Sequence, residues 1–208
     1  DGGRVLIVGV RSIISAAVEA IQLKSSGSIE IQDVKEIQGK TQGITLEDSS
    51  ELIINGVVQL IEGSGNEGIK ANNKCKISVE NVLLLSGATS GVVATENCRV
   101  ILRDIDAIEG KSEDGVSVSG GTLLVKYDIG RVQDSSVRGQ RSGCVLSNKA
   151  RSVWSNYTLI EGQDADGISL ASGSNLALRN IELVQGFDDG ITLNADCRID
   201  IRDVQEIV

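Results

Sequence analysis

The 208-residue sequence contains no histidine, no proline and no methionine, and aromatic residues make up only 2% of it. Without histidine, the chain lacks the side chain that most often serves as a general base or metal ligand near neutral pH. Without proline, no position is barred from donating its backbone N–H to a β-ladder. A core of this composition must be aliphatic, and 24 glycines provide for many turns.

The sequence also lacks an excess of positive charge and a long apolar run. Its formal net charge is −9, with 29 acidic and 20 basic residues. This balance disfavours nucleic acid and anionic membranes as partners. No apolar stretch is long enough to cross a bilayer, so we expect no membrane insertion. The absence of methionine indicates a processed, excised or engineered segment.

A motif of about 24 residues recurs through the whole chain. Each copy reads apolar-x-apolar-x-[Asn/Asp/Gly]-apolar, then a polar turn, then Gly-apolar-x-apolar, as in "SNLALRNIELVQGFDDGITL". The Gly, Asn or Asp, here termed the anchor, belongs to the residue types that tolerate a left-handed backbone. The nine anchors are Gly9, Asp33, Gly56, Asn81, Asp104, Asp128, Asn156, Asn180 and Asp203.

Positions around the anchor are alike from copy to copy. The residue after the anchor is apolar or aromatic in every copy, Val57 and Ile129 included, and the residue six before it is always small. The residue two before it is apolar in every copy except the one with Lys126. Alternation with a period of two predicts strands. A unit this short buries its apolar face only when a neighbouring copy stacks on it.

This pattern resembles the pectin-lyase-like superfamily along essentially the whole chain, and an asparagine ladder at one turn is a hallmark of that superfamily. We therefore expect an all-β, right-handed parallel β-helix of about eight coils of 23–28 residues, with three short strands per coil. It would form a single domain over residues 1–208 that lacks terminal caps. A leucine-rich repeat has a similar period, but its Asn lies three residues beyond the second Leu, whereas here the distance is two.

A second resemblance is local. Residues 164–193 resemble the part of polygalacturonase-type glycoside hydrolases that runs from an Asn-Thr-Asp motif to an Asp-Asp motif. The resemblance implies that Asp166, Asp188 and Asp189 are catalytic carboxylates of an inverting hydrolysis, in which a carboxylic acid protonates the leaving oxygen and a carboxylate activates water. The first motif reads Asp-Ala-Asp here, Gly190 replaces the Cys after the Asp pair, and the Gly-His-Gly and Arg-x-Lys motifs of the family do not appear.

Acidic turns also form for structural reasons alone. Asp favours turns through its own hydrogen bonding, and "EDGV" at 113–116 is an acidic turn without the partner motifs. Carboxylates in such turns also suit Ca²⁺, which takes several oxygen ligands. A calcium ion at Asp164, Asp166, Asp188 and Asp189 is therefore an alternative to a solvated acidic face. No other metal and no cofactor is expected.

A polysaccharide would contact the residues that surround these turns. The longest coil carries the insertion "RVQDSSVRGQRSG", and insertions in solenoids map to loops that often lie on the working face. Its Arg138 and Arg141 are candidate substrate-binding residues, together with Asp114 and Asp164 of the neighbouring acidic turns.

Three of the four cysteines, Cys75, Cys98 and Cys197, occupy the small position six before the anchor. Cys75 and Cys98 belong to adjacent coils, so a disulfide between them is conceivable on geometry. The favoured interpretation is a set of buried free thiols that pack as small hydrophobes. Cys144 is expected to point inward from another strand.

The preferred function is that of a non-catalytic extracellular β-solenoid: an adhesin, spike, filament or scaffold segment, facing a glycan, at the cell or virion surface. The uncapped ends predict self-association by end stacking or trimerisation. One alternative is a polysaccharide-degrading hydrolase of polygalacturonase type, or a remnant of one. The other is an engineered or excised solenoid without native activity. The sequence leaves the question of catalysis open and leans against it.

Overall fold

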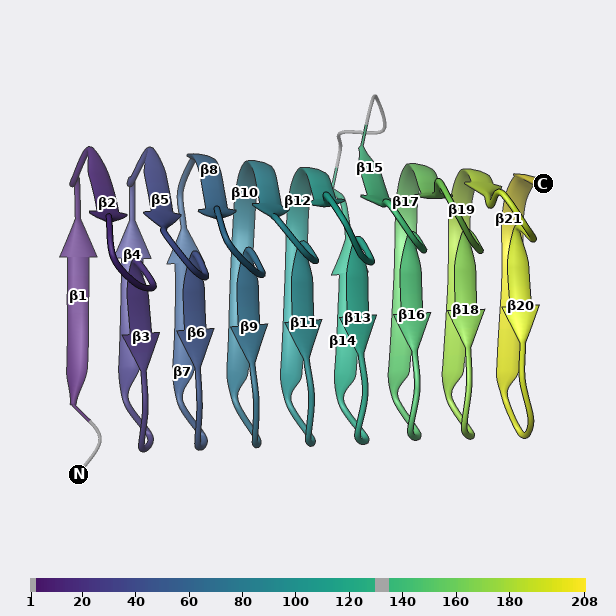
Figure 1. The fold of residues 1–208 in the computed structure, drawn as a ribbon, viewed down its shortest axis with the longest axis horizontal. Coiled ribbons are helices and arrows are strands. Elements are labelled where there is room, and N and C mark those ends of the chain that lie inside the picture. Colours follow the sequence, from purple (N-terminus) through teal and green to yellow (C-terminus); the bar gives the residue numbers. More distant parts are fainter. Residues whose placement is uncertain (1–2, 130–134) are drawn as a thin grey trace.

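Each coil of the chain lies against the next with its strands parallel and in register (Figure 1). The computed structural model describes residues 3–129 and 135–208, and the secondary structure within them is 21 strands. These strands form two sheets that run the length of the molecule, so the chain is an all-β solenoid of about eight turns. None of the described residues forms a helix of the length and hydropathy that a membrane crossing requires.

The first sheet has 13 strands. Nine of them precede or pass through the anchor of a coil, namely β1 (Arg4–Val8), β4 (Ser28–Gln32), β7 (Glu51–Asn55), β10 (Lys76–Gly87), β12 (Arg99–Gly110), β14 (Leu123–Tyr127), β17 (Arg151–Gly162), β19 (Asn175–Gln185) and β21 (Arg198–Ile207). Four follow the anchor as separate strands, namely β2 (Ser12–Ser15), β5 (Glu36–Gly39), β8 (Val58–Gly63) and β15 (Ser136–Gly139).

The second sheet has eight strands of three residues each. They correspond to the Gly-apolar-x-apolar part of the motif and comprise β3 (Ile21–Leu23), β6 (Ile44–Leu46), β9 (Ile69–Ala71), β11 (Val92–Ala94), β13 (Val116–Val118), β16 (Cys144–Leu146), β18 (Ile168–Leu170) and β20 (Ile191–Leu193). The predicted three strands per coil are present in the coils where a separate strand follows the anchor. In β10, β12, β17, β19 and β21 the first two strands instead run on through the bend as one.

The anchors align along one bend of the solenoid, as the sequence predicts. Eight of the nine have a left-handed backbone, with φ between 51° and 89°, and within the described residues Asp128 is the exception. The Nδ2 atom of Asn180 donates a hydrogen bond to Oδ1 of Asn156 (3.0 Å), and Nδ2 of Asn156 donates one to the carbonyl oxygen of Asp128 (2.8 Å). Asparagine side chains therefore link adjacent coils at this bend.

Two residues predicted to point inward do not. Val57 is 61% exposed, whereas Val58 is fully buried. Ile54 pairs with Val79, and Val58 pairs with Val82. Between these paired positions the coil of Val57 has one more residue at the bend than the next coil, so its inward position shifts by one. Ile129, just before the insertion of the longest coil, is 64% exposed. For these two residues the predicted burial was wrong, because chain length at the bend varies between coils.

The core between the sheets consists of stacked aliphatic columns, with Ile, Leu and Val from successive coils fully buried. Lys126, Trp154 and Tyr157 are also fully buried and lie together, with Lys126 over the Tyr157 ring and the two aromatic rings edge to face. Cys75, Cys98 and Cys144 are buried free thiols, as favoured from the sequence, and Cys197 is partly exposed.

Candidate functional site

The acidic residues singled out from the sequence lie in the turns that lead from the first sheet into the second. These turns are so tight that the chain folds back on its own glycines. A Cβ atom on Gly186 would lie 1.9 Å from the carbonyl oxygen of Asp189. Real Cβ atoms do not approach an oxygen so closely, so glycine is required at the first position of this turn.

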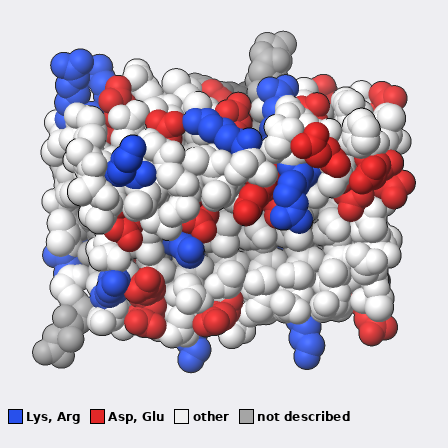
Figure 2. Space-filling view, viewed as in Figure 1, with Lys and Arg blue, Asp and Glu red and all other residues white. Residues whose placement is uncertain are grey.

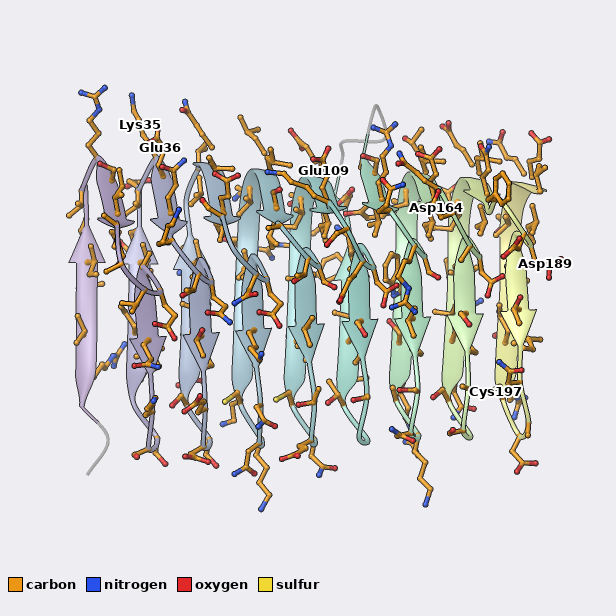
Figure 3. All side chains as sticks on the ribbon, viewed as in Figure 1. Lys35, Glu36, Glu109, Asp164, Asp189 and Cys197 are labelled. Atoms are coloured by element: carbon orange, nitrogen blue, oxygen red, sulfur yellow. The ribbon has the colours of Figure 1, made fainter. Side chains whose placement is uncertain are left out.

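Asp166 and Asp189 occupy equivalent positions in adjacent coils. The N–H of Gly167 donates a hydrogen bond to the carbonyl oxygen of Asp189 (2.9 Å), which places the two turns directly on each other. Asp166 is partly buried, whereas Asp188 and Asp189 are exposed. Figure 3 shows Asp189 at the outer edge of the last coil. Its Oδ2 atom accepts a hydrogen bond from Thr192 Oγ1 at 3.5 Å.

Asp114 is the buried residue among the acids predicted for these turns, and it is only 7% exposed. Burial raises the pKa of its carboxyl group, while the charge of Arg141 and a hydrogen bond from the backbone N–H of Ser142 (3.4 Å) act in the opposite direction. Of the predicted substrate-binding residues, Asp114 and Arg141 therefore lie close enough to interact electrostatically.

Arg138 lies at a polar hollow of about 290 Å³, and Asp164 contacts one of the other residues that line it. Arg138 lines it and forms an ion pair with Glu161 (3.0 Å), and Gln140, another lining residue, donates a hydrogen bond from Nε2 to Oδ2 of Asp164 (2.8 Å). The three candidate catalytic carboxylates do not line this hollow. Residues 130–134 of the predicted insertion lie outside the described residues.

Positive and negative groups are interspersed over the face shown in Figure 2, and acidic groups gather over the last coils. Within the described ranges, no three Asp, Glu or Cys side chains are grouped so that they could hold a metal ion. A calcium ion at the acidic turns stays a prediction.

The structure also contains a surface that none of the sequence patterns above predicts. Seven of the eleven arginines project from the outer side of the first sheet, in strands β1, β12, β17, β19 and β21. They stand either five residues or one residue before an anchor, as Arg151 and Arg179 do, and strand alternation turns both positions outward. The repeat register contained this signal, because positions five and one before the anchor can be read in every copy.

The family model described as "Right handed beta helix region" matches residues 19–180, which is more than three quarters of the sequence. No curated protein matches the chain, and no solved structure does.

Proposed function

The chain belongs to the right-handed beta-helix family, and from this premise we propose that it is a non-catalytic extracellular β-solenoid, a scaffold or adhesin segment whose outer faces contact a glycan. The form of the turns carries the proposal. The distance from the glycine Cβ position to the folded-back carbonyl oxygen is 1.9 Å for Gly87 with Ser90, for Gly139 with Ser142 and for Gly186 with Asp189. Turns in which the residue lies three positions after the glycine thus close to the same distance with serine and with aspartate, which supports a structural role for Asp189.

The chemistry of an inverting hydrolase supports the same conclusion. Such an enzyme needs one carboxyl group that holds its proton near neutral pH, and apolar enclosure is the usual means. Asp188 and Asp189 are exposed at the surface. Burial raises the pKa of the carboxyl groups of Asp114 and Asp128. Of these two, Asp114 belongs to the acidic turns, and it lies two coils before Asp166.

A location at the extracellular, cell or virion surface belongs to this proposal, as does self-association by end stacking or by trimerisation. Sheet edges left unpaired at the end of a solenoid are templates for pairing with another chain. Multi-angle light scattering over a range of protein concentrations tests the association, and a monomer at every concentration would remove it from the proposal.

The second candidate is a polysaccharide hydrolase of polygalacturonase type. It is favoured by the direct stacking of the Asp166 and Asp189 turns, which brings two carboxylates to neighbouring positions on one face. Its active centre would need a nucleophilic water between such groups.

Release of reducing ends from polygalacturonate and from a panel of other polysaccharides distinguishes the two functions. We expect no release above buffer for the wild type and for Asp189→Asn, with an active polygalacturonase as the assay control. Asparagine suits the turn as well as aspartate does, so the variant should keep its fold. Release by the wild type that is lost in Asp189→Asn would establish the hydrolase and end the scaffold proposal.

A further inference from the structure

A row of unpaired cations runs along the outer side of the first sheet. Lys76, Arg99, Arg151 and Arg198, here termed the basic row, all stand five residues before an anchor and are exposed. Strand register aligns them, because Lys76 pairs with Arg99 and the two later arginines follow two coils apart. Coils are about 4.8 Å apart, so those arginines recur at about 10 Å. Within residues 3–129 and 135–208, none of the four forms an ion pair.

An apolar floor lies beside the basic row. It comprises the outward residues three before the anchor in four successive coils, Ile101, Val125, Val153 and Ala177. Two hollows open onto this surface. One of about 330 Å³ is lined by Arg151, Arg198, Val153, Ala177 and Asp200 among others, and one of about 240 Å³ by Lys76, Arg99, Ile101 and Glu51 among others.

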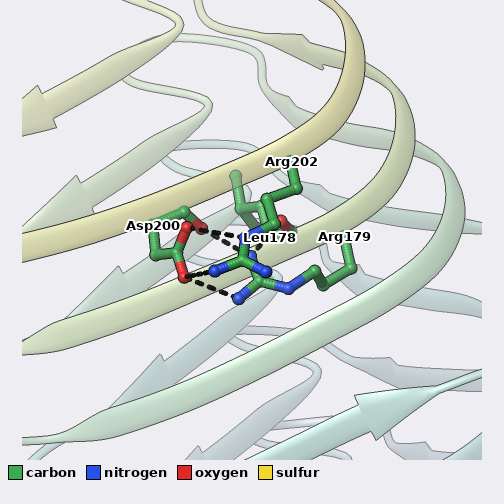
Figure 4. Close-up of polar contacts among 4 residues, drawn as sticks. All are labelled: Leu178, Arg179, Asp200 and Arg202. Atoms are coloured by element: carbon green, nitrogen blue, oxygen red, sulfur yellow. Dashed lines mark hydrogen bonds and ion pairs between the residues drawn. The ribbon is translucent and has the colours of Figure 1, made fainter.

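The far side of the floor is also basic, but each of its arginines contacts an acid. Asp200 accepts a hydrogen bond at Oδ2 from Arg179 (2.6 Å) and contacts Arg202 at 3.4 Å (Figure 4). Arg103 pairs with Glu80. The arginines of this side therefore have partners within the protein, whereas the basic row has donors to offer to a ligand.

The charge of this face is opposite to that of the chain. From β10 to β21, the outward positions five, three and one before the anchors hold seven cations and two acids, Glu80 and Asp200. The chain as a whole carries −9. A local excess of about five positive charges in so acidic a protein creates a positive potential that attracts and orients anions.

We propose that this face binds a linear anionic polysaccharide, whose carboxylate or sulfate groups pair with the basic row while its sugar rings lie on the apolar floor. Guanidinium groups present planar, bidentate donors that match such oxyanions. The inference rests on the proposed function in taking a glycan as the ligand.

The form of the surface selects this class of ligand. Small molecules occupy concave sites that enclose most of their surface, whereas this face is an open strip along several coils. Single-stranded nucleic acids bind by stacking bases on aromatic side chains, and the floor here is aliphatic. Regularly spaced cations along a straight sheet match a polymer with regularly spaced anions.

Binding is tested by titration calorimetry in EDTA, which prevents calcium from bridging acidic turns to the polymer. The ligands are polygalacturonate, dextran sulfate, neutral dextran and single-stranded DNA. Arg151→Ser/Arg198→Ser removes two cations beside the larger hollow. Arg11→Ser/Lys35→Ser removes two exposed cations elsewhere and gives the same net charge. Thermal melting verifies that both variants are folded.

We expect polygalacturonate or dextran sulfate to bind and neutral dextran not to bind. Two lost ion pairs of an exposed site weaken binding by about tenfold in Arg151→Ser/Arg198→Ser, and the control pair changes it less than twofold. The stronger of the two anionic polymers identifies carboxylate or sulfate as the preferred group. Equal weakening by both variants, absence of binding to both polymers, or equally tight and arginine-dependent DNA binding would overturn the inference.

These results separate the inference from the proposed function. A protein that binds neither polymer and releases no reducing ends loses the binding face but is still a non-catalytic scaffold. A protein that binds polygalacturonate through the basic row and also cleaves it keeps the binding face and loses the scaffold function.

Discussion

The ammonium nitrogen of Lys126 lies 3.9 Å from the centre of the Tyr157 ring, inside the core of the solenoid. The ring is held in place because its hydroxyl donates a hydrogen bond to the carbonyl oxygen of Ile105 (2.9 Å). Burial lowers the pKa of Lys126 to about 7, although the charge of Asp128 acts to raise it. A titratable amine thus interrupts a column that is otherwise apolar.

Replacing Lys126 with Met should remove a pH dependence of stability. The ordinary pKa of lysine is 10.5 and the folded value is about 7, so between these pH values the unfolded chain binds one proton more than the folded chain. Stability then rises with pH by up to about 1.4 kcal/mol per unit. From pH 7.5 to 9.5, the free energy of unfolding of the wild type should gain about 2 kcal/mol relative to Lys126→Met.

Urea denaturation of both proteins at the two pH values measures this difference. Titrating groups that do not interact with Lys126, such as the Cys75 thiol, are present in both proteins and cancel in the comparison. Asp128 does not cancel fully, because the charge of Lys126 lowers its pKa, so Lys126→Met/Asp128→Asn is compared with Asp128→Asn as a second pair. Parallel pH profiles would show that Lys126 has the same affinity for protons in the folded and unfolded chains.

The same residue shows what the sequence could reveal. Lys126 stood out as the one break in an apolar row, because the repeat register assigns every residue to a column. Its contact with Tyr157 did not follow, since Tyr157 is one coil further on and beyond the anchor. Val57 was misplaced because one extra residue at a bend shifts the inward position, and strand alternation cannot detect a bulge.

The candidate site was predictable to a similar degree. The stacking of the Asp166 and Asp189 turns follows from the register and is present in the structure. The basic row could also be predicted from the register, because the positions five before the anchors point outward in every coil. The site predictions concerned only the acids that precede the Gly-apolar-x-apolar strands. Pairing of Asp200 with Arg179 depends on side-chain geometry, which no spacing rule provides.

The asparagine at the anchor of the seventh coil should stabilise the solenoid through its side chain. Asn156 donates one hydrogen bond to Asp128 and accepts one from Asn180, and its φ is 62°. Asn156→Ala loses both bonds and places alanine in a left-handed backbone, at a cost of about 2–3 kcal/mol.

Asn81→Ala is the matched control. Asn81 has a φ of 58°, and its side chain makes no hydrogen bond with another of the described residues. It should lose only the backbone preference, about 1 kcal/mol. Urea denaturation at pH 7 measures both variants, and equal losses would mean that the side-chain ladder contributes nothing.

The four cysteines should differ in their reactivity with a thiol reagent. A hydrogen bond with Cys98 is the main cause that lowers the pKa of Cys75 to about 7, which would make this thiol reactive if a reagent could reach it. Cys75, Cys98 and Cys144 are buried, whereas Cys197 is partly exposed. We expect one thiol to react with Ellman's reagent in the native protein and four in urea, and Cys197→Ser to remove the native reaction. Two thiols in urea instead of four would indicate a Cys75–Cys98 disulfide.

The turns that lead from the first sheet into the second should tolerate a change of acid far better than a change of glycine. A Cβ atom on Gly87 would lie 1.9 Å from the carbonyl oxygen of Ser90 and 2.7 Å from the backbone nitrogen of Gly68. Both obstacles are backbone atoms of stacked turns, so neither can move without separating two coils. Gly87→Ala should therefore destabilise the protein by more than about 3 kcal/mol.

Gly27→Ala provides the comparison, because the nearest atoms to its Cβ position are at ordinary contact distances of 3.4 and 3.6 Å. Its expected effect is within about 0.5 kcal/mol, measured by urea denaturation beside Gly87→Ala and Asp189→Asn. A small loss in Gly87→Ala would mean that the turns can open. They would then be free to reposition the carboxylates of Asp166 and Asp189, and the case against catalysis that rests on their fixed geometry would fail. A large loss in Gly87→Ala, with Gly27→Ala and Asp189→Asn near wild type, is the result that a rigid structural turn requires.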